Sequence, residues 1–159
     1  MNEPFDFIEM KVPAKSDYVG VARLTASGLA NRMGFSYEEI EDLKVAISEA
    51  ITNTVKHAYT EEGAGEVTVG FGLYEDRMEV MIADYGDSFN LKSIKENIGP
   101  YNEDIPISNM KEGGFGLFLI DALMDKVEIT NNNGVIVLMT KYLFENEVGR
   151  SDDQVSTTQ

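Results

Sequence analysis

The stretch EAITNTVKHAY, residues 49–59, carries two sets of side chains that recur at helical spacing. Glu49, Asn53 and His57 follow one another at intervals of four, so they lie within about 80° of one another on a helix. A second, mainly apolar stripe lies about a third of a turn away. The polar stripe therefore borders the buried face, where a cleft can form. The buried stripe comprises Ile40, Leu43, Ile47, Ala50, Ile51, Thr54 and Ala58.

The pair Glu49 and Asn53 has the chemistry of a metal and phosphate site. An Asn side-chain oxygen is a hard, neutral ligand for Mg²⁺, and a Glu carboxylate can orient or deprotonate a nucleophile. The same spacing also occurs on solvated helix faces. By itself it leaves both interpretations open.

Two further elements are predicted before this helix. Residues 5–12 alternate loosely and stop at Pro13, which indicates a strand. A first helix is expected from a Ser16 cap to Gly34. The capping box of Ser36 and Glu39 then opens the second helix, which runs to about Tyr59.

The second half of the chain predicts strands and one more helix. Residues 66–74 predict a strand with Val67, Val69, Phe71 and Leu73 on one face. In the next predicted strand, one face carries Met78, Val80 and Ile82. Helical spacing returns at 115–125, and strands are expected at 126–130 and 134–143. This order predicts an α+β two-layer sandwich in which helices cover one face of a mixed β-sheet.

Residues 85–112 are too long and irregular for an ordinary connection. A segment of this kind is either a lid or binding loop, or a disordered insertion. Just before it, Asp84 falls on the apolar face of its strand by period-two counting. A buried carboxylate needs a donor, either an adenine amine or nearby backbone amides.

The sequence GGFGL, residues 113–117, is a glycine cluster that leads directly into a predicted helix. Glycines allow backbone amides to approach a phosphate, and a helix N-terminus attracts anions. The pattern is thus a candidate triphosphate cradle, although such clusters also form simple turns. It matches neither the P-loop nor the full Rossmann glycine pattern.

Charge and composition exclude several classes of protein. The chain has 13 Lys and Arg against 28 Asp and Glu, a net charge of −15, which disfavours direct nucleic-acid binding. The acidic surface either serves solubility or favours a basic protein partner. The chain has no cysteine, so it has no disulfides, and no apolar run approaches the about 20 residues of a membrane span. We expect a cytoplasmic protein with one domain over 1–145 and a disordered acidic tail over 146–159.

The combination and order of these motifs is more specific than any one of them. A helical ExxxN, a strand-terminal DxG, a long loop, GGxGL and a later strand threonine resemble the N, G1 and G2 boxes of the GHKL superfamily, which has a Bergerat-type fold with a long ATP lid. Within it, the chain resembles the RsbW family of anti-sigma-B serine kinases from 7–13 to 141–143. The quoted motifs are EAITNTVKHAY, ADYGDSF, NIGPY, EGGFGLFLIDALMD and MTKYL.

The resemblance implies a role for each motif residue. Asn53 is implied as the Mg²⁺ ligand and Glu49 as the catalytic base. Asp84 is implied to bind adenine with Gly86 beneath the ring, and Thr140 to join the adenine water network. The phosphate loop would include Gly113, Gly114 and Gly116, with Lys56 and Lys111 as candidate cations by position. Further nucleotide contacts are implied at His57, Phe89, Ile98, Gly99, Phe115 and Leu117.

One motif departs from the superfamily pattern, because DxGxG stands as DYGDS here. Because of this departure, the resemblance does not define how the lid hinges. It still implies the adenine contact of Asp84. The single histidine, His57, is interpreted as a helix residue at the cleft edge rather than as a phosphoacceptor.

The resemblance also implies partners. A homodimer would sequester a sigma-B-type sigma factor and transfer phosphate from Mg²⁺-ATP to a serine of an RsbV-type anti-anti-sigma protein. Arg23 in the first helix is either part of this partner surface or part of ordinary core packing. The alternatives are a nucleotide-gated binding protein and a GHKL ATPase without a protein acceptor.

Overall fold

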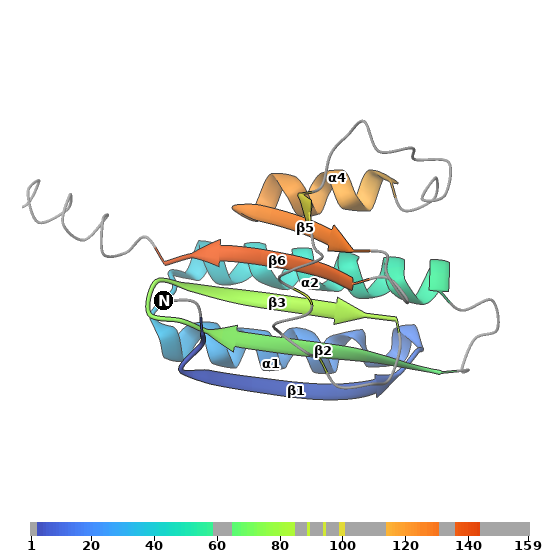
Figure 1. The fold of residues 1–159 in the computed structure, drawn as a ribbon, viewed down its shortest axis with the longest axis horizontal. Coiled ribbons are helices and arrows are strands. Elements are labelled where there is room, and N and C mark those ends of the chain that lie inside the picture. The colour runs from blue at the N-terminus through green and yellow to red at the C-terminus, as the bar shows by residue number, and fades with distance from the viewer. Residues whose placement is uncertain are drawn as a thin grey trace, which may run out of the picture.

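The computed structural model describes residues 3–58, 65–84, 89, 94, 99–100, 114–130 and 136–143. The predicted order of elements is confirmed, with a short additional strand, β4, inside the predicted loop (Figure 1). The elements are β1 (Asp6–Pro13), η1 (Ser16–Tyr18), α1 (Val19–Met33), α2 (Tyr37–Ala58), β2 (Glu66–Leu73), β3 (Arg77–Ala83), β4 (Gly99–Pro100), α4 (Gly114–Leu123), β5 (Lys126–Thr130) and β6 (Ile136–Tyr142).

The six strands form one sheet in the order β1-β2-β3-β6-β5-β4. The predicted two-layer sandwich is confirmed, but all five pairings between described strands are antiparallel, where a mixed sheet was expected. The first connection shows why. Two helices in succession carry the chain back and forth, so Glu66 begins β2 opposite Pro13 at the end of β1. The returning strand must then run antiparallel.

Local signals fix two of the helix ends, the start of α2 and the end of α1. In the capping box, the Ser36 amide donates to Glu39 Oε1 at 2.8 Å and the Glu39 amide donates to Ser36 Oγ at 3.1 Å. Gly34 ends α1 with a left-handed φ of 100°, as predicted. The predicted Ser16 cap is wrong. Ser16 begins the 3-10 turn η1, and α1 starts only after Tyr18 without a side-chain cap.

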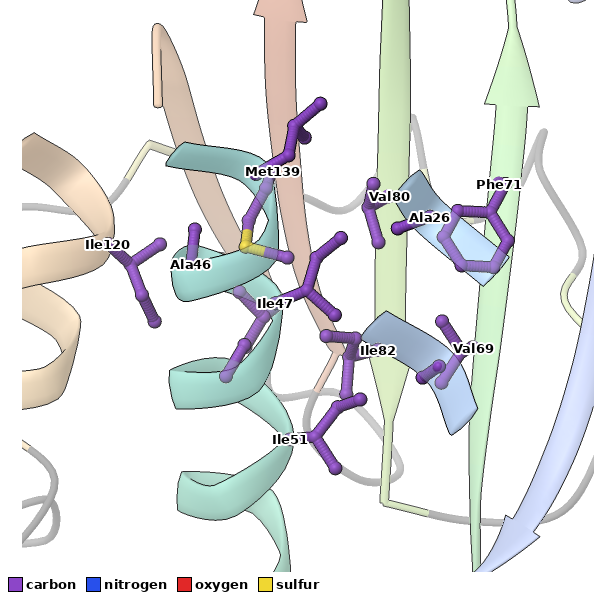
Figure 2. Packing of buried hydrophobic residues seen from close by; sticks show 14 of the residues in the cluster. Ala26, Ala46, Ile47, Ile51, Val69, Phe71, Val80, Ile82, Ile120 and Met139 are labelled. Carbon is purple, nitrogen blue, oxygen red and sulfur yellow. The ribbon is translucent and has the colours of Figure 1, made fainter. Parts of the chain in front are cut away.

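The main core lies between the helices and the sheet. Figure 2 shows Ile47 and Ile51 of α2 facing Val80 and Ile82 of β3, with Ile120 of α4 beside α2. The apolar faces predicted for β2 and β3 are confirmed, since their residues are buried in this cluster. Each large side chain buried in this way contributes about 1.5–3 kcal/mol, which fixes the rotation of α2 about its axis.

The other face of the sheet carries a second buried cluster. Met81, Ala83, Ile136 and Leu138 form it together with Ile94, and Phe7 and Phe89 pack against it. Two residues of the predicted 85–112 loop, Phe89 and Ile94, thus cover the sheet face opposite α2, while Gly99 and Pro100 pair with β5. These described parts of the loop are docked on the sheet because its second face is also apolar.

Lys141 ties two helices to the C-terminal end of β6. Its Nζ donates to the Leu123 carbonyl at 2.7 Å and lies 3.8 Å from Asp42 Oδ2. The side chain is only 11% exposed. A cation is favourable at the C-terminus of α4, where carbonyl groups lack helical partners.

We expect Lys141→Met to lower the free energy of unfolding by about 1–2 kcal/mol, because it removes a buried charge-assisted hydrogen bond while keeping the apolar stem. Urea unfolding measures the change. The control is Lys44→Met, which breaks a surface pair with Glu41 and should change stability by less than about 0.5–1 kcal/mol. Equal losses in both variants would contradict a special role for Lys141.

Candidate functional site

Three elements reach the same end of the sandwich. Lys141 marks the opposite end, next to Leu123 of α4 and Asp42 of α2, and it pairs with Met78 of β3. From there, α2 rises about 17 Å to Asn53 and α4 about 14 Å to Gly114, at 1.5 Å per residue. Along β3, the five residues to Ala83 cover about 17 Å. We call the end that these elements reach, on the right in Figure 1, the site end.

Glu49 and Asn53 are half-buried at the border of the core. Their neighbours Ala50 and Ile51 are 2% and 1% exposed. Because the buried residues fix how α2 faces the sheet, the two polar side chains lie along the margin of the helix. The predicted position of the polar stripe is therefore confirmed for these two residues.

Asn53 has an unusual side chain. Its Nδ2 atom is buried and has no hydrogen-bond partner among the described residues. An unsatisfied buried polar atom costs about 1–3 kcal/mol, so such atoms are rare. Rotating the amide exchanges nitrogen and oxygen, so this position can offer a donor or an acceptor to a ligand.

A metal at Asn53 would need further ligands. No group of three or more Asp, Glu, His or Cys side chains in the described part of the chain is placed to hold a metal. Mg²⁺ usually keeps several waters and takes substrate phosphate oxygens as ligands.

Asp84 follows β3 directly and is half-buried. Continuing the alternation of Val80 and Ile82 places it on the helix-covered face. Ile51 lies beside Ile82 in Figure 2, so Asn53 and Asp84 each lie two residues farther toward the site end. Asp84 already interacts within the chain, and a ligand there would share or replace that interaction.

The helix α4 begins at the site end with Gly114. Gly116 also lies in its first turn, along with the backbones of Phe115 and Leu117. The first amide groups of a helix have no partners within it, and the helix dipole adds positive potential. This is the predicted setting for a phosphate, and it lies level with Asn53.

Several predicted site residues cannot be placed around this end. Gly86, Ile98, Lys111 and Gly113 lie outside the described residues. The same holds for the side chain of His57, although its backbone belongs to α2. Lys56 is exposed, three residues beyond Asn53 on α2.

Thr140 does not belong to this group, which corrects the expectation for it. It is buried and pairs with Glu79 and Lys126, next to Lys141 at the opposite end. Its neighbour Met139 belongs to the helix-side core, so Thr140 points to the other face. Side chains alternate between the two faces along a strand, so Thr140 cannot contact a ligand that Asp84 binds on the helix side of the sheet.

Phe89 and Gly99 also lie away from Asn53. Phe89 packs against Gly70 on the sheet face opposite α2. Gly99 lies in β4, the edge strand, and pairs with Ile129 of β5. Two strands, β5 and β6, lie between β4 and β3. Neither residue is placed to contact a nucleotide between α2 and α4.

Arg23 lies outside the core positions of α1. Its Nη1 donates to Ser48 Oγ at 3.4 Å, directly before Glu49 on α2. Its neighbours Val21 and Leu24 are 46% and 68% exposed. This environment favours the surface interpretation over core packing.

Comparison with known proteins agrees with this geometry. The histidine kinase-like ATPase domain family matches residues 12–141. A serine-protein kinase RsbW of Oceanobacillus iheyensis is 64% identical over 155 residues, covering 98% of this chain and 98% of the relative. An RsbW of Bacillus mycoides is 52% identical over 157 residues, covering 99% and 98%. The chain belongs to the RsbW serine-protein kinase family.

A solved structure supports the RsbW fold. The crystal structure of the RsbU and RsbW domains of a Mycobacterium tuberculosis protein matches with a TM-score of 0.60 at 19% identity. The match covers 88% of this chain and 33% of that longer one. At this identity the likeness concerns the fold alone.

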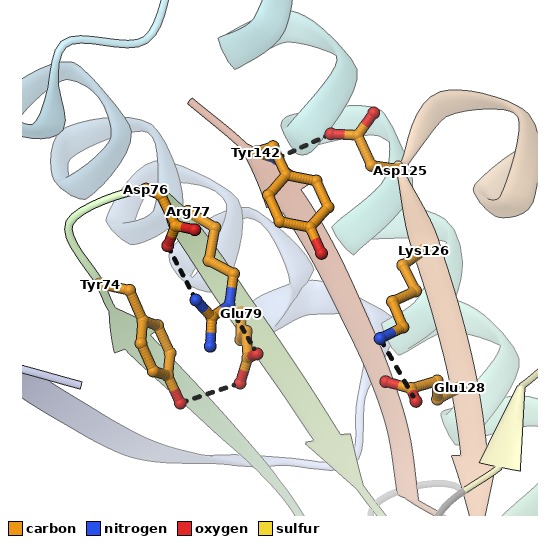
Figure 3. A network of polar contacts seen from close by, with 8 residues as sticks. All are labelled: Tyr74, Asp76, Arg77, Glu79, Asp125, Lys126, Glu128 and Tyr142. Atoms are coloured by element: carbon orange, nitrogen blue, oxygen red, sulfur yellow. Dashed lines mark hydrogen bonds and ion pairs between the residues drawn. The ribbon is translucent and has the colours of Figure 1, made fainter. Parts of the chain in front are cut away.

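The end opposite the site holds a polar cluster that the sequence analysis missed in this RsbW chain (Figure 3). Glu79 lies on the sheet face opposite α2 and is 4% exposed. Its Oε1 accepts from the Tyr74 hydroxyl at 3.1 Å and its Oε2 from Arg77 Nε at 3.0 Å. The Arg77 guanidinium lies 3.7 Å from the Tyr74 ring centroid. The only sequence signal was a charged pair two residues apart, which also occurs in ordinary exposed strands.

Burial, followed by the Glu79 carboxylate, raises the pKa of Tyr74 from 10.0 to about 12. Below pH 10 the phenol is neutral in both folded and unfolded chains. Between pH 10 and about 12 the unfolded chain loses this proton while the folded chain keeps it, so stability falls as pH rises.

We expect Tyr74→Phe to flatten this fall in the free energy of unfolding between pH 10 and 12. At pH 7 the variant should lose about 1.5–3 kcal/mol, because a hydrogen bond to a charged group disappears. Urea titrations at several pH values measure both effects. Tyr37→Phe, at a residue that is 77% exposed, should keep the wild-type slope. Parallel curves for wild type and Tyr74→Phe would refute the assignment.

Proposed function

We propose that the chain binds ATP at the site end, between the C-terminal half of α2 and the start of α4, and phosphorylates a serine of a protein antagonist. Family membership makes the chain a serine-protein kinase, and its ATPase-type domain makes ATP the phosphoryl donor. The proposal is supported by three groups that lie at this end of the sandwich. They are Asn53, whose buried Nδ2 has no partner among the described residues, Asp84, and the first turn of α4.

In this proposal each residue has one task. Asp84 accepts a hydrogen bond from the adenine amine. The free amides at the start of α4, from Gly114, hold the phosphates. Asn53 is the protein ligand of Mg²⁺, which supplies charge neutralisation on the phosphate oxygens when bound. Lys56 is exposed on the same part of α2 and is a candidate cation.

Glu49, one helical turn before Asn53, is the proposed general base. The serine oxygen forms a bond to the γ-phosphorus while the bond to the bridging oxygen of ADP breaks. Glu49 takes the serine proton as this happens. Because phosphoryl transfer has a loose transition state, most of the acceleration comes from positioning and electrostatics. Proton removal adds a factor of about 10²–10⁴.

The same chain is proposed to bind two partners as a homodimer. One is a sigma-B-type sigma factor, and the other is the RsbV-type anti-anti-sigma protein that carries the serine. The face of α1 beside Arg23 supports this, since Val21 and Leu24 are exposed next to a charged group that contacts α2. The net charge of −15 disfavours direct DNA binding, which fits regulation through proteins.

We expect Glu49→Gln to reduce phosphate transfer at least about 10²-fold while ATP affinity changes little. Transfer is measured with γ-labelled ATP and the purified anti-anti-sigma protein, and affinity by calorimetry. Glu41→Gln on the same helix is the matched control and should keep full activity. Asp84→Asn should instead abolish ATP binding. Full labelling by Glu49→Gln would remove Glu49 from the chemistry.

The partner surface is tested with Leu24→Glu. A charge on an apolar contact should weaken sigma-factor binding by at least about tenfold, or 1.4 kcal/mol, without changing ATP affinity. Phe5→Glu, at an exposed aromatic residue before β1, is the control. Unchanged binding in the Leu24 variant, measured by surface plasmon resonance, would exclude this face of α1.

A further inference from the structure

The sheet face opposite α2 contains a socket at Gly70, a gap that the rings of Phe7 and Phe89 fill. A Cβ atom added to Gly70 would lie 2.7 Å from Phe7 Cζ and 2.9 Å from two ring atoms of Phe89. Gly70 lies within β2, opposite Glu9 of β1 and Met81 of β3. Because β2 is paired on both sides, the rings would have to move to make room for a side chain.

Phe89 is held in this socket by its ring and by its backbone. Its ring meets Phe7 edge-on, with centroids 6.3 Å apart and an interplanar angle of 88°. Its amide donates to Glu9 Oε1 at 3.2 Å, while Glu9 Oε2 accepts from Lys11 Nζ at 3.2 Å. Phe89 is therefore anchored to both β1 and β2.

This anchor is close in sequence to the proposed adenine contact. Phe89 lies only five residues after Asp84, a span of at most about 18 Å. Asp84 continues the helix side of β3, whereas Phe89 sits on the other face. Asp84 and Phe89 are therefore separated by only four residues in the chain, although they lie on opposite faces of the sheet.

We propose that Phe89 is a positioning residue for the nucleotide site, and that its seat on Gly70 and Glu9 keeps Asp84 oriented for adenine. This inference rests on the proposed function. Without the anchor, Asp84 would stand at a strand end, where backbone hydrogen bonds open most easily. Since Phe89 does not touch the reacting groups, its loss should change nucleotide affinity and leave kcat unchanged.

The main test is Gly70→Ala, which should displace the Phe89 ring. We expect the Kd and KM for ATP to rise about tenfold with kcat within twofold of wild type. Phe89→Ala should do the same, and Phe89→Leu should restore most of the affinity. The double variant Gly70→Ala with Phe89→Ala should bind ATP no more weakly than either single variant, because both substitutions act through one contact.

Two glycines serve as controls. Gly72→Ala lies two residues farther on β2, where an added Cβ would lie 3.2 Å from a Tyr74 ring atom and would not meet Phe89. Gly28→Ala lies on α1 with nothing within 4 Å. Both should keep ATP affinity within twofold. Urea unfolding of all variants separates a local effect from general loss of stability.

A nucleotide-free measurement tests the anchor directly. By NMR, the Phe89 amide of wild type should be protected from hydrogen exchange without ATP, and Gly70→Ala and Glu9→Ala should lose this protection. An unprotected wild-type amide would overturn the inference. So would wild-type ATP affinity in both the Gly70 and Phe89 variants, and that result would leave the proposed function standing. Failure of wild type to bind ATP would overturn both proposals.

Discussion

The packing of α2 against β3 is the constraint on which the site depends. Ile47 and Ile51 are fully buried and face Val80 and Ile82. Successive helix residues differ by about 100° in direction, so this contact also sets the direction of Glu49. A rotation of α2 by one residue would turn apolar groups outward and the carboxylate inward, at a cost far above the few kcal/mol available to a domain.

Contacts on both faces of the sheet position the elements of the site. Its helix side carries the core that aligns α2 and α4, and its other side is covered by residues from the connection after Asp84. Small residues make the second arrangement feasible. Gly70 leaves room for two aromatic rings above a strand that is hydrogen-bonded on both sides. The order of the site therefore depends on contacts that no ligand would touch.

Patterns that depend on neighbouring residues in the chain predicted well. The apolar stripe of α2, the Ser36 capping box and the alternation of β2 needed only helix or strand geometry. The capping box and the alternation are confirmed, and the stripe is confirmed for its described members such as Ile47 and Ile51. Thr140 failed because a motif assigns a residue without fixing strand register or face, and one residue of register reverses the face. Phe89 failed for a related reason, since only the tertiary structure shows which face a connecting segment covers.

The two ends of the sandwich treat buried polar groups differently. At the end near Lys141, the buried carboxylate of Glu79 accepts hydrogen bonds from Tyr74 and Arg77, which offset the cost of burying its charge. At the site end, Asn53 buries an amide without a partner among the described residues. Burying the Asn53 Nδ2 group lowers the stability of the fold unless a hydrogen-bond acceptor offsets the lost contact with water. The Glu79 carboxylate is therefore satisfied within the fold, whereas Asn53 Nδ2 has no partner among the described residues, and this contrast is what points to a ligand at the proposed site.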